Sequence, residues 1–256
     1  FLLSKLKKNN GKVFLSACGS DSYYWKFGKE RLRYGPFEDI IKYDLNGIQA
    51  KQAGVKAFKF NKYLAENVDG VIPVCYEYYL SYKHCKNIRA LIPHPLYLKN
   101  LDSDLRKLEY PIKIFHGLSR YGLKGTRHIK KAFEIIKKIY NDKVDISIEG
   151  NLPFVIYLKK ITQKDLLVDQ CYSFSYGVNA LYGMALKKIV FSGAESEVNE
   201  IMQVKNIPVE NIIPNHEIIV EKISKYIENP KLIKEISEKG REYVIRNHNA
   251  PMIAEK

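Results

Sequence analysis

Residues 111–126 read Pro-Ile-Lys-Ile-Phe-His-Gly-Leu-Ser-Arg-Tyr-Gly-Leu-Lys-Gly-Thr. A short apolar strand runs into a glycine-containing loop that carries Arg120 and Lys124 and opens a helix. Glycine lets the backbone approach an anion closely, the amides of a helix start point at it, and nearby cations neutralise its charge. The loop is not a P-loop, because Leu123 separates the second glycine from Lys124. We expect a phosphate site here, with an ordinary strand-to-helix turn as the alternative.

Short apolar runs alternate with helical patterns along the whole chain. Within 127–140, Ile129, Ala132, Phe133 and Ile136 show the three-and-four spacing of one buried helix face. Alternation of strand and helix predicts an α/β protein with parallel sheets and right-handed crossovers. The predicted strands are 12–17, 70–74, 88–92, 112–115, 144–148, 166–169 and 189–192. The proline-containing stretch 93–112 is the predicted hinge between two α/β units.

Charge and cysteine usage limit the function classes. The 256 residues carry 42 basic and 28 acidic side chains, a net charge of +14. Either an anionic partner or a generally lysine-coated surface, as an AT-rich genome favours, explains that charge. The 4 cysteines are scattered without ligand spacing, so we expect a reduced, cytoplasmic protein without structural zinc. The chain lacks an initiator Met, and we expect it to be a piece of a longer protein.

A second loop completes the predicted site. The strand 166–169 leads into the loop 170–176, and a helix begins at Gly177. Helix starts at the carboxyl edge of a parallel sheet are common ligand sites, so the starts near Thr126 and Gly177 are expected to hold a diphosphate between them. The alternative is that Gly177 only permits tight packing.

Three stretches resemble the donor-binding domain of the GT-B glycosyltransferases, especially the retaining enzymes of glycosyltransferase family 4. They are Phe115-His116-Gly117 through Lys124-Gly125-Thr126, the block from Asp165 to Ala185, and Ile189-Val190-Phe191-Ser192-Gly193-Ala194-Glu195. Upstream, Ala17-Cys18-Gly19-Ser20-Asp21 is similar to a turn late in that family's acceptor domain. The resemblance implies two Rossmann-like parallel-sheet domains, the first incomplete. The implied boundaries are a partial acceptor domain at 1–98, a hinge at 99–111, a donor domain at 112–247 and the start of a return segment at 248–256.

The resemblance also implies site residues and a reaction. The reaction is transfer of a sugar from a nucleotide-diphosphate sugar, the substrate, to a glycan or lipid-linked acceptor in surface polysaccharide or glycan biosynthesis. We expect neither a cofactor nor a metal, because protein cations stabilise the leaving diphosphate. The catalytic candidates are Arg120, Lys124 and Asp21, and the donor-binding candidates are Gly117, Gly125, Thr126, Glu149, Asp169, Gln170, Ser175, Tyr176, Gly177, Val178 and Tyr182.

Two of the chain's departures from the family remove carboxylates. The two glutamates that bind the donor sugar and ribose in the family align with Phe174 and Tyr182. A carboxylate accepts several hydroxyl bonds, whereas a phenol offers one weaker contact and phenylalanine none. Donor recognition is therefore either rearranged, with Glu149, Asp169 and Gln170 as substitutes, or lost. A noncatalytic GT-B-fold protein that binds nucleotide or glycan, or partners an active enzyme, is the rival interpretation; an epimerase of the same fold is a third.

The segment 23–37 interleaves aromatic and cationic residues. Such a run stacks on sugars, lies at the surface of an anionic membrane, binds single-stranded nucleic acid, or is part core and part snorkelled surface. A peripheral position at the inner face of the membrane is the corresponding expectation for localisation. No nucleic-acid partner is expected.

Overall fold

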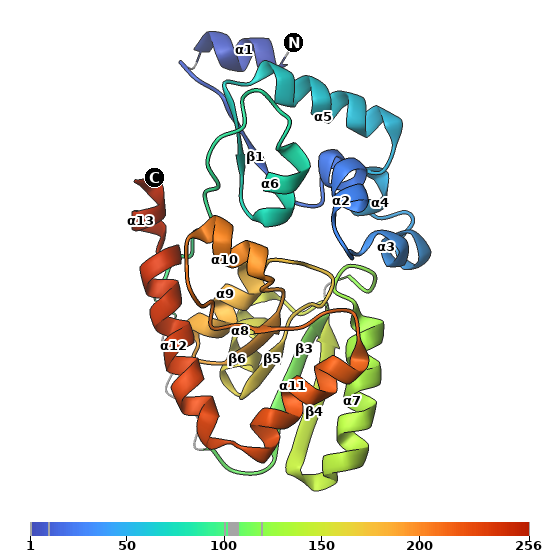
Figure 1. Ribbon diagram of the computed structural model, residues 1–256, viewed down its shortest axis with the longest axis vertical. Coiled ribbons are helices and arrows are strands. Elements are labelled where there is room, and N and C mark those ends of the chain that lie inside the picture. Colours follow the sequence, from blue (N-terminus) through green and yellow to red (C-terminus); the bar gives the residue numbers. More distant parts are fainter. Residues whose placement is uncertain (1, 10, 100, 102–107, 119, 256) are drawn as a thin grey trace. The chain divides into compact units, whose positions relative to one another are not determined.

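The computed structural model describes residues 2–9, 11–99, 101, 108–118 and 120–255. The chain divides into two compact units, Phe1–Pro93 and His94–Lys256, both of which are drawn in Figure 1. The division falls at the start of the predicted hinge 93–112, although residues 100 and 102–107 of that hinge lie outside the described part. The finer domain boundaries stay predictions.

The first unit contains a two-stranded parallel sheet. Strands β1 (Phe14–Ala17) and β2 (Gly70–Pro73) pair from Phe14↔Gly70 to Ala17↔Pro73. Its helices are α1 (Leu2–Asn9), a π-helical turn (Tyr24–Gly28), α2 (Lys29–Arg31), α3 (Phe37–Tyr43), α4 (Ile48–Lys51), α5 (Val55–Asn67) and α6 (Tyr76–Tyr82).

The predicted strand 88–92 is wrong, because a register slip breaks the ladder there. Arg89 N–H donates to Val71 O at 2.8 Å, but the next bond to β2 comes from Ile92 N–H to Pro73 O at 3.0 Å. Between these two bonds the segment advances by three residues while β2 advances by two, so that only an isolated bridge, Val71↔Ile88, is formed.

The aromatic residues of the segment 23–37 build core. Tyr23, Tyr24, Trp25 and Phe37 are each 6% exposed. Tyr23 stacks on Tyr82 with ring centroids 4.2 Å apart. Of the interpretations open for this run, the structure therefore supports packing, and these four rings are not available to sugars or lipid headgroups.

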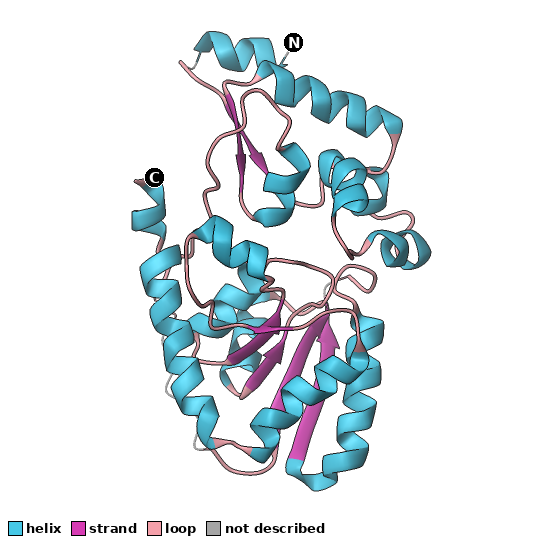
Figure 2. Cartoon of the chain, viewed as in Figure 1, coloured by secondary structure: helices cyan, strands magenta, loops and turns pink. Residues whose placement is uncertain are grey.

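The second unit is a five-stranded parallel sheet in the order β4-β3-β5-β6-β7. Its strands are β3 (Ile112–Leu118), β4 (Val144–Gly150), β5 (Leu166–Val168), β6 (Ile189–Ser192) and β7 (Glu210–Asn211). Its helices are α7 (Thr126–Tyr140), a 3-10 turn (Asn141–Lys143), α8 (Phe154–Thr162), α9 (Val178–Ala185), α10 (Ser196–Met202), α11 (His216–Glu228), α12 (Lys231–His248) and α13 (Ala250–Ala254). Figure 2 shows these helices around the strands. The two-residue strand β7 has no sequence signal that distinguishes it from a loop.

Helices cover both faces of this sheet. Ile112 and Ile114 pack in one core cluster with Ile129 and Ile136 of α7 and Ile219 of α11. On the opposite face, Phe115 lies 5.7 Å from the Tyr157 ring of α8. Because β4 and β5 flank β3 on opposite sides, the crossover direction reverses at β3, and the carboxyl ends of β3 and β5 form a topological switch point.

The ends of the second unit pair with each other. Leu96 N–H donates to His248 O at 2.6 Å, and Ala250 N–H donates to Leu96 O at 3.0 Å. The segment that begins at His94 and the short helix α13 therefore belong structurally to the second unit. No described helix is long and apolar enough to cross a membrane.

Gly193 provides a test of the packing of this unit. A Cβ there would lie 2.0 Å from Ser173 O and 2.6 Å from its carbonyl carbon, both backbone atoms. We expect Gly193→Ala to lower the free energy of unfolding by about 1–3 kcal/mol, measured by urea denaturation. Gly11→Ala is the control, because a Cβ at Gly11 meets nothing within 4 Å. Equal stability of the two variants would contradict the close approach.

Candidate functional site

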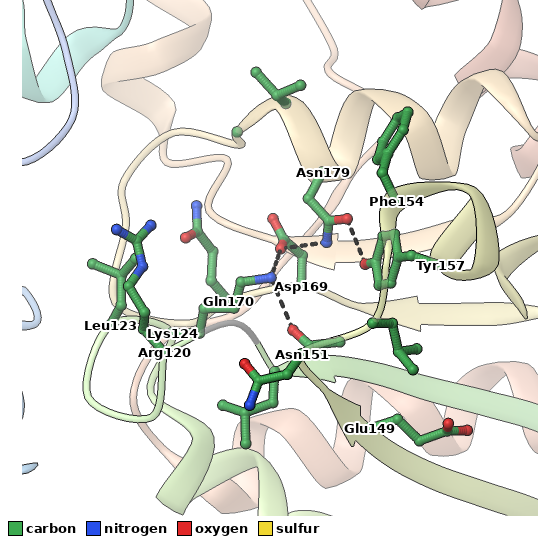
Figure 3. A pocket seen from close by; sticks show the side chains of 15 residues that line it. Arg120, Leu123, Lys124, Glu149, Asn151, Phe154, Tyr157, Asp169, Gln170 and Asn179 are labelled. Carbon is green, nitrogen blue, oxygen red and sulfur yellow. Dashed lines mark hydrogen bonds and ion pairs between the residues drawn. The ribbon is translucent and has the colours of Figure 1, made fainter.

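A cavity of about 440 Å³ opens at the carboxyl ends of β3 and β5, at the switch point. This volume lies within the range of about 300–1,000 Å³ that small-molecule sites occupy. Figure 3 shows Lys124 and Asn179 reaching Asp169, with Tyr157 next to Asn179. The residues that line it are Gly117, Leu118, Arg120, Leu123, Lys124, Glu149, Asn151, Leu152, Phe154, Tyr157, Asp169, Gln170, Gly177, Val178 and Asn179.

Two glycines shape the loop that carries the cations. Gly125 has φ +73°, a left-handed conformation, and is the N-cap of α7. At Gly117 a Cβ would lie 2.5 Å from the ring of Tyr157. Glycine at this position therefore leaves room for Tyr157 of α8 to pack over the end of β3. Lys124 and Tyr157 both line the cavity.

Lys124 is turned inward and is 8% exposed. Its Nζ donates to Gly117 O at 3.0 Å and to Asp169 Oδ1 at 2.9 Å. Asp169, 1% exposed, also accepts bonds from Asn179 Nδ2 at 2.7 Å and Ser192 Oγ at 3.1 Å. Burial alone would raise the pKa of Asp169, but the Lys124 charge and these bonds outweigh it and hold the pKa below its usual value. The Asp169 carboxylate is therefore ionised, and within the described part of the chain the Lys124 ammonium uses two of its three N–H donors.

The bonds continue from Asp169 to the helix α8. Tyr157 OH donates to Asn179 Oδ1, while the amide of Asn179 donates to Asp169. Burial raises the pKa of Tyr157, so its phenol stays protonated as this donor. Tyr157, Asn179, Asp169 and Lys124 form one polar chain, the floor network, which joins α8, α9, the end of β5 and the loop after β3.

His116 lies beneath this floor and is fully buried. Its Nδ1 is 2.8 Å from Val168 O and its Nε2 is 3.0 Å from Thr126 Oγ1. Burial lowers its pKa to about 4. Because the carbonyl accepts only, Nδ1 carries the proton of a neutral ring, and Nε2 accepts from the Thr126 hydroxyl. His116 therefore ties β3, β5 and α7 together, as expected for a strand-end residue.

The rim of the cavity combines charge and apolar surface. Glu149, at the end of β4, pairs with Lys160 Nζ at 2.5 Å. Phe154 is 53% exposed and packs edge-on against Tyr182, with ring centroids 5.1 Å apart. Arg120 is exposed on the other side of the floor network, as Figure 3 shows.

The structure gathers many, but not all, of the predicted site residues. Those that line the cavity are Gly117, Arg120, Lys124, Glu149, Asp169, Gln170, Gly177 and Val178. Of Thr126, Ser175 and Tyr176, none lines it, and all three are buried. Tyr176 OH lies 2.7 Å from Tyr243 OH and 2.9 Å from His248 Nε2, so its phenol is directed to α12.

The positions of the two family glutamates differ in accessibility. Phe174 is 2% exposed and does not line the cavity, so a side chain there is packed in the interior. Tyr182 is half-buried and does not line the cavity itself, but its ring packs against Phe154, which does. Gly125 contributes conformation at the start of α7 and is likewise absent from the lining.

Asp21 belongs to the first unit and caps a helical turn there. Its Oδ1 accepts from Tyr24 N–H at 3.0 Å and its Oδ2 from Tyr82 OH at 2.8 Å. Burial raises its pKa to about 6 despite these bonds. Both carboxylate oxygens thus have internal partners.

Four further residues line the cavity that were not predicted from the sequence: Asn151, Phe154, Tyr157 and Asn179. Asn179 had a usable signal, since it stands in the first turn of a helix at the carboxyl edge of the sheet. Tyr157 had none, because its helix resembles any apolar helix in sequence. Within the described part of the chain, no three His, Cys, Asp or Glu side chains group as a metal site requires.

The buried His116 predicts a pH dependence of stability. Its folded pKa of about 4 lies below the ordinary 6.5, so the unfolded chain takes up the proton first as the pH falls. The contribution of His116 to the free energy of unfolding is complete above pH 6.5 and is lost as the pH falls toward 4. Between about pH 7 and 5 we expect the unfolding free energy of the wild type to fall by about 2 kcal/mol more than that of His116→Gln. Parallel urea-unfolding profiles would show that the ring is not held neutral.

No family model matches the chain, and no curated protein matches it in sequence. Solved structures do match. HepE from Anabaena in complex with UDP is 10% identical, with 99% of this chain and 80% of HepE covered and a TM-score of 0.61. Sucrose-phosphate synthase from Thermosynechococcus elongatus is 17% identical over 99% of this chain and 74% of that protein, with a TM-score of 0.57.

A variant of S. aureus TarM, in complex with fondaparinux, α-GlcNAc-glycerol and UDP, is 20% identical with a TM-score of 0.57. That match covers 77% of this chain but only 45% of TarM, so the chain spans less than half of this neighbour. These neighbours are GT-B glycosyltransferases. The two α/β units with parallel sheets accordingly have the GT-B type of fold.

Proposed function

We propose that the cavity of the second unit binds a nucleotide-diphosphate sugar and that the protein is a glycosyltransferase. The observation that carries the proposal is the meeting of Arg120, Lys124 and the start of α9 at the switch point of the parallel sheet. Neighbours of the same fold bind UDP, and HepE was also crystallised with UDP-glucose, which supports a uridine nucleotide as the first ligand to test.

The proposed chemistry is departure of a diphosphate from the sugar. Negative charge develops on the leaving oxygens, so fixed cations and amides stabilise the transition state more than the ground state. Arg120 and Lys124 supply positive charge, and the backbone amides of Gly177 and Val178 supply hydrogen-bond donors at the start of α9. This device requires no metal.

Sugar and ribose contacts in this proposal differ from those of the family. Since Phe174 is packed inside, Glu149 and Gln170 at the rim are the proposed acceptors and donors for hydroxyls, with Asn151 added by the structure. Asp169 is the proposed anchor of Lys124, and its bonds with Lys124, Asn179 and Ser192 leave it little capacity for a sugar. The acceptor is proposed to be a glycan or a lipid-linked glycan.

A noncatalytic nucleotide-binding or partner protein of the same fold is the second candidate. The charge compensation of Lys124 by Asp169 favours it, since this pair lowers the net positive potential of the cavity. In both candidates the cavity binds nucleotide. They differ in whether sugar is transferred.

Arg120 tests the anion site without disturbing the buried pair. We expect Arg120→Ala to weaken UDP binding by about 1.5–3 kcal/mol, the range for a hydrogen bond to a charged group, as measured by titration calorimetry. Arg246→Ala is the matched control, because Arg246 is exposed on α12 outside the cavity lining and pairs with Glu242 in the same helix. UDP affinity that is equal in both variants would place the anion elsewhere.

A substitution at Gly177 distinguishes a role in ligand binding from a role in packing. A Cβ there would come no closer than 3.7 Å to any neighbour, Gln170 Nε2. We expect Gly177→Ala to keep the stability of the wild type within about 0.5 kcal/mol. We expect it to lower UDP affinity about tenfold, since the methyl group occupies the approach to the helix amides. Unchanged calorimetric affinity would contradict contact between the ligand and this helix start.

Transfer itself decides between the two candidates. Labelled UDP-sugars incubated with glycan and lipid-linked acceptors are expected to yield labelled product with the wild-type protein, and less with Arg120→Ala. Nucleotide binding without product, followed by product formation in Tyr182→Glu, would favour the noncatalytic candidate. Tyr182 is the informative position because it is half-buried at the rim, whereas Phe174→Glu would bury an unpaired carboxylate.

A further inference from the structure

The outer face of helix α5 in the first unit has an unusual composition. Phe60 is 64% exposed and Tyr63 is 47% exposed. Lys56 and Lys59 are also exposed, and positions 56, 59, 60 and 63 follow the three-and-four spacing of a helix. Residues at these separations share one side of a helix. We call Lys56, Lys59, Phe60 and Tyr63 the lysine–aromatic face.

The opposite side of α5 fixes this orientation. Phe58, Leu64 and Ala65 pack in the core cluster of the first unit. Asn61 Oδ1 accepts from Tyr82 OH at 3.1 Å and from Tyr23 N–H at 3.3 Å. Rotation of the helix would bury lysines and break these bonds, so the lysine–aromatic face is a fixed outward surface of this element.

Apolar exposure extends into the preceding segment. Of the 20 exposed large hydrophobic residues in the described part of the chain, seven fall between residues 41 and 63. Leu45 is 62%, Ile48 72% and Val55 70% exposed. Exposed apolar side chains scattered singly are ordinary, but a concentration in one short stretch indicates a contact surface.

Lysine dominates the charges of this stretch, although Lys62 pairs with Glu66 further along α5. Residues 41–63 contain five lysines, at 42, 51, 56, 59 and 62, and a single acidic residue, Asp44. No acidic residue stands three or four positions from Lys56 or Lys59, where a helical ion pair would form. A partner that complements this surface must be apolar in its interior and anionic at its edge.

We propose that the lysine–aromatic face, with the apolar residues between 41 and 55, docks on an anionic lipid surface. Aromatic rings lie at headgroup depth, aliphatic side chains enter the acyl boundary, and lysine stems reach back to the phosphates. This surface is distinct from residues 23–37, whose rings are buried. It is also independent of the cavity of the second unit, so it stands or falls separately from the proposed function.

Vesicle co-sedimentation tests the proposal. The 256-residue protein is mixed with vesicles of phosphatidylcholine alone or with about one third phosphatidylglycerol. Binding to the mixed vesicles only, reduced at high salt, is the expected result. Absence of binding, or equal binding to both compositions, would overturn the proposal.

Two variants and one control locate the surface. Lys56→Gln/Lys59→Gln and Phe60→Ser/Tyr63→Ser are each expected to lower partitioning about tenfold or more, because each removes one of the two attractions. The control Lys130→Gln/Lys131→Gln removes the same charge from exposed positions of α7 and is expected to bind like the wild type. An equal loss in the control would mean that net charge alone drives binding and would refute the assigned surface. All these positions are exposed, so unchanged thermal unfolding is the check on folding.

Discussion

The buried ion pair between Lys124 and Asp169 governs the second unit and its cavity. It closes the end of β5 against the loop after β3, and Asn179, Tyr157 and Ser192 are arranged around it. Two charges removed from water are tolerated only when their remaining bonding capacity is met, and here the carboxylate receives three side-chain donors. Removing one member would strand the other. The pair therefore sets where every other polar group of the floor network lies, and it also limits how much positive charge a ligand meets.

The sequence predicts the scaffold better than the site. Alternating apolar runs predicted six of the strands and the parallel α/β fold, because burial on both sides of a sheet leaves a strong pattern in Ile112–Phe115 or Ile189–Ser192. The glycine loop and the helix start at Gly177 were also readable. What the residue pattern lacks is the partner of Lys124. Asp169 stands 45 positions away, and only the adjacency of β3 and β5 brings the two together.

Aromatic residues were the least readable part of the chain. Tyr23, Tyr24 and Trp25 have the composition of a stacking surface, but they form core because their helical turn faces α6 and Phe37. Conversely, α5 has the sequence pattern of an ordinary amphipathic helix, and the outward orientation of Phe60 is known only from its exposed fraction in the structure. The neighbours of the same fold are 10–20% identical, which is enough for a shared architecture and too little to transfer a reaction. Function depends here on the particular side chains at one sheet edge.

The contact at Gly193 has a consequence for motion. The backbone leaving β6 lies directly against the carbonyl of Ser173, and Glu195 N–H donates to Phe174 O at 3.0 Å. The loop after β5 and the turn after β6 are thus mechanically one body. Ala194 also donates its N–H to the side-chain oxygen of Asn211 in β7 at 2.8 Å. Consecutive contacts therefore link three successive strand ends, from β5 through β6 to the edge strand β7.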